Sequence, residues 1–164
     1  MYSKTANNSP HCRLARFKNS NPFYSVMDHY TQESSGKSLK GVIICGSKAG
    51  YEGNKTFSLE QTLTFLEQIN VEIANSGLSP IPCIVVEGTL VGRSTSGLYR
   101  ERAYTLNFSW SPRIPAPPKD EFYNTLLEYA CQLGSKMEQE RIYVEFEGTT
   151  FVFKRKGSES PPRD

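Results

Sequence analysis

Residues 99–110 read YRERAYTLNFSW, and the alternation in this stretch decides the fold. Every second position from Arg100 to Trp110 is basic near the start of the stretch and aromatic or aliphatic near its end. The positions between them are mostly polar or small. A period of two is typical of a β-strand, whose successive side chains point to opposite faces of a sheet. We therefore expect a strand here, with rings toward the core and arginines at a charged rim.

Two apolar runs upstream predict two further strands. Residues 39–45 (LKGVIIC) contain three consecutive β-branched side chains, which favours a central strand. Residues 81–91 begin beside Pro80 and Pro82, and proline cannot donate to a ladder, so we expect an edge strand or a strand end there. The polar residues 92–97 then predict a turn into residues 99–110. Gly46, Gly50 and Gly53 indicate a loop after the first strand.

Two stretches with helical periodicity are predicted to pack on the sheet. Residues 57–75 begin with Ser58 and Gln61, the pattern of a capping box, and end at a Gly-containing turn. Residues 119–133 carry Asp120 and Glu121 in the first turn, and Gly134 is expected to end the helix. The predicted buried stripes are Leu59, Leu63, Leu66, Ile69 and Ile73 in the first helix, and Phe122, Leu126, Tyr129, Ala130 and Leu133 in the second.

A terminal hairpin completes the order of elements. Residues 141–146 and 149–154 alternate, and the pair Glu147-Gly148 between them fits a two-residue turn. The predicted order is β-α-β-β-α-β with one added strand. This order indicates an α+β, ferredoxin-like antiparallel sheet with two helices on one face and an extra C-terminal hairpin strand. Because the other face must also be covered, we expect a homodimer or a larger ring.

Charge and composition divide the chain into three parts. Residues 1–40 carry six basic and two acidic side chains, residues 154–164 carry four and two, and the part between has a net charge of −4. We predict a disordered polar and basic arm over 1–36, an α+β domain over 37–155 and a disordered tail over 156–164. Met27 is a candidate translation start, which the sequence leaves open. The basic ends suit solvated tails better than a nucleic-acid interface, because the domain itself is acidic.

Several classes of function are disfavoured. The four cysteines, Cys12, Cys45, Cys83 and Cys131, form no CxxC pair, and His11 and His29 are the only histidines, so we predict no metal site and no cofactor. No apolar run reaches the roughly 18 residues of a membrane span, and no secretory h-region is present. We expect a cytoplasmic protein without a membrane partner.

The leading functional hypothesis is a non-enzymatic, oligomeric module that binds a small anionic ligand, such as a nucleotide. Guanidinium groups pair with carboxylates and phosphates, and aromatic rings stack on bases. The predicted ligand-binding residues are Arg93, Arg100, Arg102, Tyr104, Asn107, Phe108, Trp110 and Arg113. A second interpretation remains open, in which Glu87, Glu101 and Glu145 pair with these arginines and the rings only build the core.

Two alternatives of other classes also remain open. The first is a dimeric α+β enzyme of isomerase or monooxygenase type, in which Glu87 or Glu101 acts as a base. No serine or histidine arrangement supports it, so we commit to no catalytic residue and favour a protein that is not an enzyme. The second is a structural or interaction protein that recruits a partner through its tails.

Three features resemble a family of small uncharacterised βαββαβ proteins from bacteria and phages. They are the glycine-rich loop before the Ser58 helix, the run Glu101-Arg102-Ala103-Tyr104 that leads to a proline-rich link, and the run Met137 to Val144 after the second helix. The likeness covers about two-thirds of the chain. It implies the same sheet-and-helix plan and no known activity.

The chain also has a distant likeness to phage anti-defence sponge proteins. Those proteins sequester cyclic nucleotide signals without cleaving them, and adjacent subunits supply the arginines and aromatic rings that hold the ligand. The matching residue types here are Arg100, Arg102, Asn107, Phe108 and Arg113. This resemblance implies a sequestering role in an oligomer.

Overall fold

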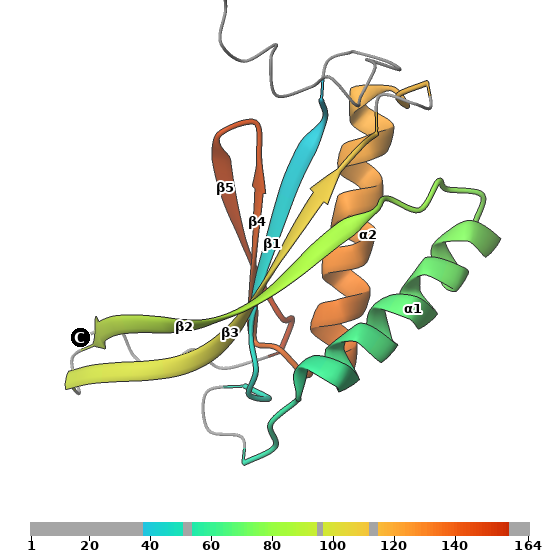
Figure 1. The fold of residues 1–164 in the computed structure, drawn as a ribbon. Coiled ribbons are helices and arrows are strands. Elements are labelled where there is room, and N and C mark those ends of the chain that lie inside the picture. The colour runs from blue at the N-terminus through green and yellow to red at the C-terminus, as the bar shows by residue number, and fades with distance from the viewer. Residues whose placement is uncertain (1–37, 51–53, 95–96, 112–114, 158–164) are drawn as a thin grey trace, which may run out of the picture. The chain divides into compact units, whose positions relative to one another are not determined.

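The computed structural model describes residues 38–50, 54–94, 97–111 and 115–157. These residues form five strands and two helices, which are labelled in Figure 1. In chain order they are β1 (Lys40–Gly46), α1 (Leu59–Asn75), β2 (Cys83–Ser94), β3 (Gly97–Ser109), α2 (Lys119–Lys136), β4 (Arg141–Phe146) and β5 (Thr149–Lys154). The predicted arm over 1–36 lies outside the described residues, as does nearly all of the predicted tail, so both remain predictions.

The strands form one antiparallel sheet in the order β2-β3-β1-β4-β5. This confirms the predicted α+β, ferredoxin-like plan with an added C-terminal strand. β1 lies in the centre, where Ile43 pairs with Leu106 of β3 on one side and with Val144 of β4 on the other. β2 lies at the edge, as its flanking prolines predicted.

Helix α1 begins with the predicted capping box. The Ser58 hydroxyl accepts a hydrogen bond from the Gln61 backbone N–H, and the Gln61 side chain accepts one from the Ser58 N–H. Leu66 and Ile73 are buried as expected, but Leu63 is exposed and Thr62 is buried instead. Leu63 lies about 60° around the helix from Leu66, at 100° per residue, so it falls beside the buried stripe. The Thr62 hydroxyl tolerates burial because it donates to the Ser58 carbonyl.

Helix α2 is longer than predicted. It buries the expected stripe together with Thr125, whose hydroxyl donates to the Glu121 carbonyl. The expectation that Gly134 ends the helix is wrong, because the helix continues to Lys136. The extra turn carries Met137 into the core, where its side chain is fully buried, and burying a side chain of this size contributes about 1.5–3 kcal/mol.

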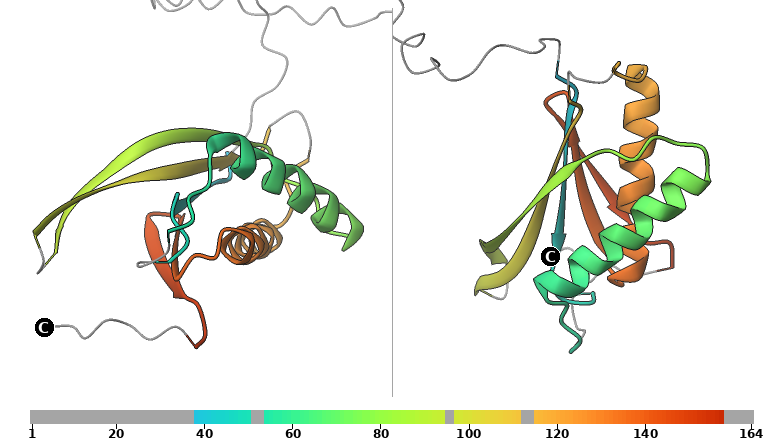
Figure 2. Two further views of the ribbon diagram at one scale, coloured as in Figure 1. Left: turned by 90° about the horizontal axis from the view of Figure 1, so that it is seen from below. Right: turned by 45° about the vertical axis from the view of Figure 1, so that its right-hand side comes forward.

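Both helices cover the same face of the sheet, as the two views in Figure 2 show. The core lies between this face and the helices, and it contains residues from every strand except β2 and β5 at full burial. Its largest fully buried side chains are Tyr104, Tyr129, Phe108, Phe122, Ile43, Ile69, Ile73, Leu106, Leu126, Leu133, Met137 and Val144. The helices thus leave the second face, called here the open face, without a covering layer in the described part of the chain.

The hairpin of β2 and β3 is the longest element of the sheet. The two strands pair continuously from Cys83 opposite Phe108 to Ser94 opposite Gly97, whereas β1 pairs with β3 only as far as Gly46 opposite Ala103. β2 and β3 therefore run on together beyond β1 as a two-stranded arm, which Figure 1 shows at the lower left. The predicted polar turn over 92–97 is shorter than expected, because pairing extends through Ser94 and Gly97.

The alternation along β3 is confirmed. Tyr104, Leu106 and Phe108 are buried under the helices, whereas Glu101, Thr105 and Asn107 are only partly buried on the open face. Strand periodicity thus places the rings in the core, as the sequence indicated.

The β4–β5 hairpin also forms as predicted. Glu147 has φ 49° and Gly148 has φ 74°. Positive φ at both central residues is the mark of a type I′ turn, which matches the twist of the flanking strands. In the part of the chain that the structure describes, no helix is both long and apolar enough to cross a membrane.

Candidate functional site

A hollow of about 540 Å³ lies where β1 ends and the β2–β3 arm continues. We call it the arm-base pocket. Ile44, Ala103 and Tyr143 line it from the open face, because Ile44 pairs with Tyr143 of β4, and Ala103 of β3 pairs with Gly46, two residues further along β1. The other lining residues are Cys45, Gly46, Lys48, Gly50, Leu90, Arg93, Tyr99, Arg100, Glu101, Gln139, Glu140 and Arg141.

The floor of the pocket is held by one buried amide side chain, that of Gln139. Its oxygen accepts a hydrogen bond from the Gly46 N–H at 3.1 Å. Its nitrogen donates to the carbonyls of Lys48, at 2.7 Å, and Met137, at 3.0 Å. Gln139 is only 8% exposed. A buried amide with these three partners fixes the course of the chain as it leaves β1, because each bond would be costly to leave unmade.

The loop after β1 is fixed by further backbone contacts. Ser47 donates to the Arg102 carbonyl at 2.9 Å, and Phe57 donates back to the Ser47 carbonyl at 2.7 Å. Gly50 has φ 59° and donates to the Glu138 carbonyl at 3.1 Å. This left-handed conformation agrees with the turn role expected of Gly50; Gly53 lies outside the described residues. Gly46 has no positive φ; instead, a side chain of β3 lies close against its backbone.

Two side chains of β3 lie flat against glycines of the neighbouring strands. A Cβ placed on Gly46 would lie 2.2 Å from Oε1 of Glu101, so the Glu101 carboxylate rests directly over the Gly46 backbone. A Cβ placed on Gly92 would lie 2.4 Å from the hydroxyl oxygen and 2.5 Å from Cζ of Tyr99. The carboxylate and the ring thus lie two residues apart on one face of β3, and both line the pocket.

The pocket carries charges of both signs. Its lining includes four basic residues, Lys48, Arg93, Arg100 and Arg141, together with Glu101 and Glu140. Arg93 and Arg100 alternate with Gly92, Tyr99 and Glu101, so their side chains start from the opposite face of the arm. Beside the loop after β1, Lys55 forms an ion pair with Glu138 and lowers the pKa of that carboxyl. This mixture suits a polar ligand that has both acceptor and donor groups.

Cys45 lies under the pocket, and its thiol is unreactive. Burial, and secondarily the negative charge of Glu101, raises the pKa of Cys45 to about 12. The thiolate is the nucleophilic form of cysteine, so this residue packs as a small apolar side chain rather than serving as a nucleophile. Among the described residues, no group of three His, Cys, Asp or Glu side chains could hold a metal ion.

The structure brings together only some of the predicted ligand-binding residues. Arg93 and Arg100 line the arm-base pocket. Arg102 lies on the helix-side face of the arm, where its Nε is 3.5 Å from the Glu87 carboxylate. This pair is the one that the second interpretation of the arginines predicted.

The predicted rings do not reach the pocket. Tyr104 is 0% exposed and its hydroxyl donates to the Phe57 carbonyl at 2.8 Å, while Phe108 is 1% exposed and packs on Tyr129. Trp110 is partly buried against the core, and Asn107 lies on the open face without lining the pocket. Arg113 lies outside the described residues.

The two carboxylates considered as bases are separated by the sheet. Glu87 pairs with Tyr104 and therefore points to the helix side, whereas Glu101 pairs with Leu90 and points to the open face. They cannot act on one substrate from the same side. Only Glu101 lines the arm-base pocket.

Several pocket residues were missed by sequence reasoning. Tyr143, Arg141 and Gln139 come from β4 and the turn before it, some thirty residues beyond the end of β3, and the antiparallel order of the sheet brings them close. The run Met137 to Val144 was noticed as a family feature, which was the one signal that could have pointed to them.

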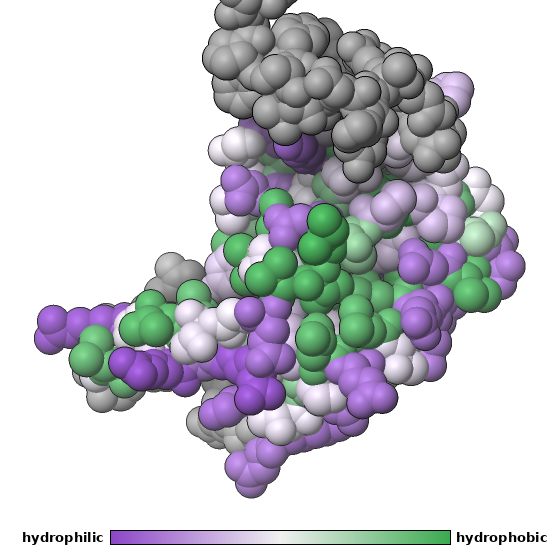
Figure 3. All heavy atoms as spheres, in the orientation of Figure 1, coloured by the Kyte–Doolittle hydropathy of each residue, from purple (hydrophilic) through white to green (hydrophobic). Residues whose placement is uncertain are grey.

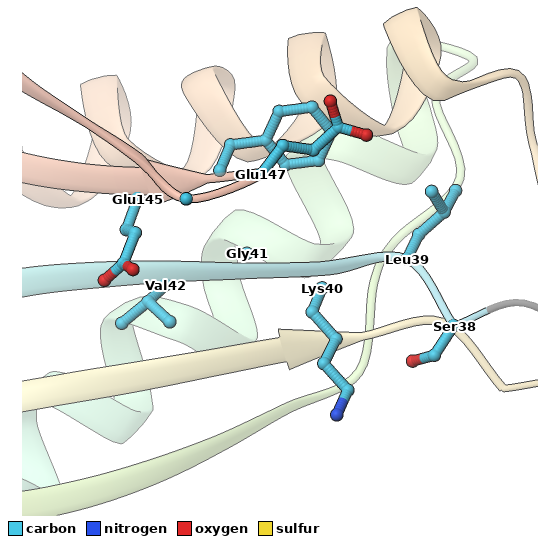
Figure 4. A pocket seen from close by; sticks show the side chains of 9 residues that line it. Ser38, Leu39, Lys40, Gly41, Val42, Glu145 and Glu147 are labelled. Carbon is cyan, nitrogen blue, oxygen red and sulfur yellow. The ribbon is translucent and has the colours of Figure 1, made fainter.

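A second hollow, of about 280 Å³, lies at the far end of β1 beside the β4–β5 turn. Figure 4 shows that its side chains diverge: Lys40, Val42 and Glu145 point to one side of β1, and Leu39 points to the other. None of the predicted ligand-binding residues lines it. The arm-base pocket is therefore the better candidate.

Comparison with known proteins adds one finding about the fold. No protein-family model matches the chain, and no curated protein matches it. Two solved structures of phage proteins are similar. A phage S-adenosylmethionine (SAM) lyase in complex with S-methyl-5'-thioadenosine has a TM-score of 0.56 at 13% identity, and the match covers 78% of this chain and 98% of that one. A phage SAM lyase in the apo state has a TM-score of 0.58 at 15% identity, covering 79% and 99%. At these identities the likeness shows that this chain shares their fold.

Proposed function

We propose that the chain binds a small nucleoside-like ligand in the arm-base pocket. The observation that carries this proposal is the juxtaposition of Tyr99 and Glu101 on one face of β3, at the edge of a hollow of about 540 Å³. This volume lies within the roughly 300–1,000 Å³ that is usual for small-molecule sites. A base can stack on the Tyr99 ring, and a carboxylate can accept hydrogen bonds from ribose hydroxyls.

The charges around the pocket refine the chemical class. Arg93 and Arg100 are exposed on the arm, and Arg141 and Glu140 approach from β4. Guanidinium groups would favour an anionic substituent on the ligand, as the sequence led us to expect. The Glu101 carboxylate would favour a hydroxyl or a cationic group instead. A nucleoside with a charged substituent satisfies both kinds of side chain.

The comparisons support this proposal without carrying it. The two similar structures are almost fully covered by the match, and one of them is in complex with S-methyl-5'-thioadenosine, a nucleoside thioether. A shared fold does not transfer an activity, because function depends on the residues of a site. The pocket residues of this chain therefore need a test of their own.

Isothermal titration with S-methyl-5'-thioadenosine, adenosine and adenosine monophosphate tests the proposal. We expect saturable binding of at least one of the three, and we expect Glu101→Gln to weaken it about tenfold. Glu87→Gln is the matched control, because Glu87 lies on the neighbouring strand but points to the other face. Equal loss in both variants, or no heat with any of the three compounds, would contradict a site at this position.

A second candidate function is lyase action on SAM, and the position of Glu101 favours it. Breaking a C–S bond of this sulfonium returns the bonding pair to sulfur and gives the neutral thioether S-methyl-5'-thioadenosine. The carbon that sulfur has left then needs a new bond. The four-carbon fragment either loses a proton to form a double bond, or closes a ring in which its own carboxylate oxygen bonds to that carbon. Glu101, with Tyr99 and Tyr143 nearby, could bind the sulfonium by charge and by cation–π contact, and its carboxylate could accept the proton that the four-carbon fragment loses. Incubating the protein with SAM and analysing the products by chromatography distinguishes the two functions. A lyase releases the thioether over many turnovers, and a sequestering protein does not.

The open face supports the further proposal that the protein is a homo-oligomer. It carries exposed apolar side chains in four strands, namely Ile84, Val86, Leu90, Tyr99, Tyr143 and Val152. Figure 3 shows hydrophobic side chains on the projecting β2–β3 arm as well, between strongly hydrophilic ones. Clusters of this kind mark interaction surfaces. A second copy that presents the same face would cover them and would enclose the arm-base pocket.

A further inference from the structure

Three glycines on the open face of β1 and β2, Gly46, Gly88 and Gly92, fall into two groups that their surroundings distinguish. Gly46 and Gly92 lie directly under side chains that line the arm-base pocket, those of Glu101 and Tyr99. Gly88 lies on the same open face of β2, pairs with Ala103, and has nothing within 4 Å of a Cβ placed on it. None of the three has a positive φ. The backbone conformation therefore does not explain why glycine stands at positions 46 and 92.

The lack of space above Gly46 explains why this residue is a glycine. A methyl group there would meet Oε1 of Glu101 at 2.2 Å and Cδ at 3.1 Å, and Oε1 of Gln139 at 3.4 Å. Ordinary contacts between such heavy atoms begin near 3.4 Å, so the carboxylate would have to move by about 1 Å or more. Gln139 is less able to yield, because it holds three backbone groups. The carboxylate is the free end of a flexible side chain, so it moves and the backbone stays.

The same relation holds for the ring of Tyr99. It lies across Gly92, its direct cross-strand partner, with the hydroxyl oxygen, Cζ and Cε1 all within 2.6 Å of the Cβ position. A ring over a strand glycine also shields the backbone from water, which helps the edge hairpin. This stabilising effect of the Tyr99 ring does not depend on a ligand. The pair of Gly46 and Glu101 lacks it, because a carboxylate has no ring with which to cover the strand.

We propose that Gly46 and Gly92 are positioning residues, whose missing side chains allow the Glu101 carboxylate and the Tyr99 ring to lie down on the sheet. The carboxylate and the ring are then presented at fixed places, and the volume above them stays open for the ligand. This inference rests on the proposed function for its ligand, but the placement of Glu101 is a property of the free protein. A displacement of about 1 Å in a binding group is enough to weaken recognition severely.

The test uses Gly46→Ala with Gly88→Ala as the matched control. In the free protein, the ¹³C resonance of the Glu101 carboxyl, assigned by its loss in Glu101→Gln, should shift in Gly46→Ala and stay in place in Gly88→Ala. In titrations with S-methyl-5'-thioadenosine, Gly46→Ala should lose about tenfold in affinity and Gly88→Ala should lose none. Circular dichroism confirms that each variant is folded.

A double-mutant cycle separates positioning from general damage. In a Glu101→Ala background there is no carboxylate for the new methyl group to displace, so Gly46→Ala should cause no further loss of affinity. An equal loss in both backgrounds, or an unmoved Glu101 resonance in Gly46→Ala, overturns the proposal. If the resonance shifts as expected and no variant binds the thioether, the positioning role stands and the proposed ligand is wrong.

Discussion

Replacing Gln139 by leucine should destabilise the protein more than any other single loss of a polar side chain in the pocket. The substitution keeps the size of the side chain but removes three hydrogen bonds, which join it to the Gly46 N–H and to the carbonyls of Lys48 and Met137. A typical intramolecular hydrogen bond contributes about 0.5–1.5 kcal/mol, and a buried group left unpaired costs about 1–3 kcal/mol. Water can reach the loop at Lys48 but not the Met137 side of the site, so we expect a loss of about 2–4 kcal/mol in the free energy of unfolding.

Urea unfolding followed by circular dichroism measures this loss, and the chain offers a matched control. Gln132 on α2 is also partly buried, but its amide donates only to Glu128, and its oxygen has no hydrogen-bond partner among the described residues. Gln132→Leu removes one helix-surface bond and an unsatisfied carbonyl, so its effect should stay within about 0.5 kcal/mol. If Gln139→Leu costs no more than Gln132→Leu, Gln139 does not hold the pocket floor.

Two further predictions concern the buried thiol and the open face. Between pH 9 and 12 the Cys45 thiol ionises in the unfolded chain but not in the folded one, because burial and then Glu101 raise its folded pKa to about 12. The contribution of this thiol to the free energy of unfolding is therefore fully present below pH 9 and is lost as the pH rises. Urea titrations at pH 8 and 10.5 should show a smaller loss of stability for Cys45→Ala than for the parent protein. Equal losses would refute the shift in the Cys45 pKa. Val86→Glu should dissociate the proposed oligomer in sedimentation velocity, whereas Val71→Glu on the exposed side of α1 should not. A monomeric parent protein would rule out the oligomer.

The fold was predictable because its signals are local. The capping box at Ser58 begins α1 where expected, and the alternation from Arg100 to Trp110 sets the two faces of β3. Errors arose where tertiary contacts override a local preference. Gly134 does not end α2, because the extra turn buries Met137, and a glycine in a helix costs only about 1 kcal/mol.

The candidate site was less predictable, because its residues meet through sheet order. Gly46 and Glu101 are neighbours only because β1 and β3 pair with Gly46 opposite Ala103, and no spacing along the chain encodes that register. Residues 99–109 form the strand that the alternation predicted, but the side chains on its two faces lie in different surroundings. The rings at positions 104 and 108 build the core, while positions 99 and 101 line the pocket.

The place of the pocket follows from unequal strand lengths. β1 leaves the sheet after Gly46, while β3 continues with β2 as its only partner strand among the described residues, through the pairs from Thr89–Arg102 to Ser94–Gly97. A sheet that loses a strand leaves a step, and the loop after β1, the start of β4 and the arm form its walls. Gln139 and Cys45 support the fold at this step, whereas the side chains of Tyr99 and Glu101 belong to no core cluster and can change at less cost to the fold. A scaffold built in this way separates stability, which lies in positions such as Tyr104, from the proposed recognition, which lies three and five residues earlier on the same strand, at Glu101 and Tyr99.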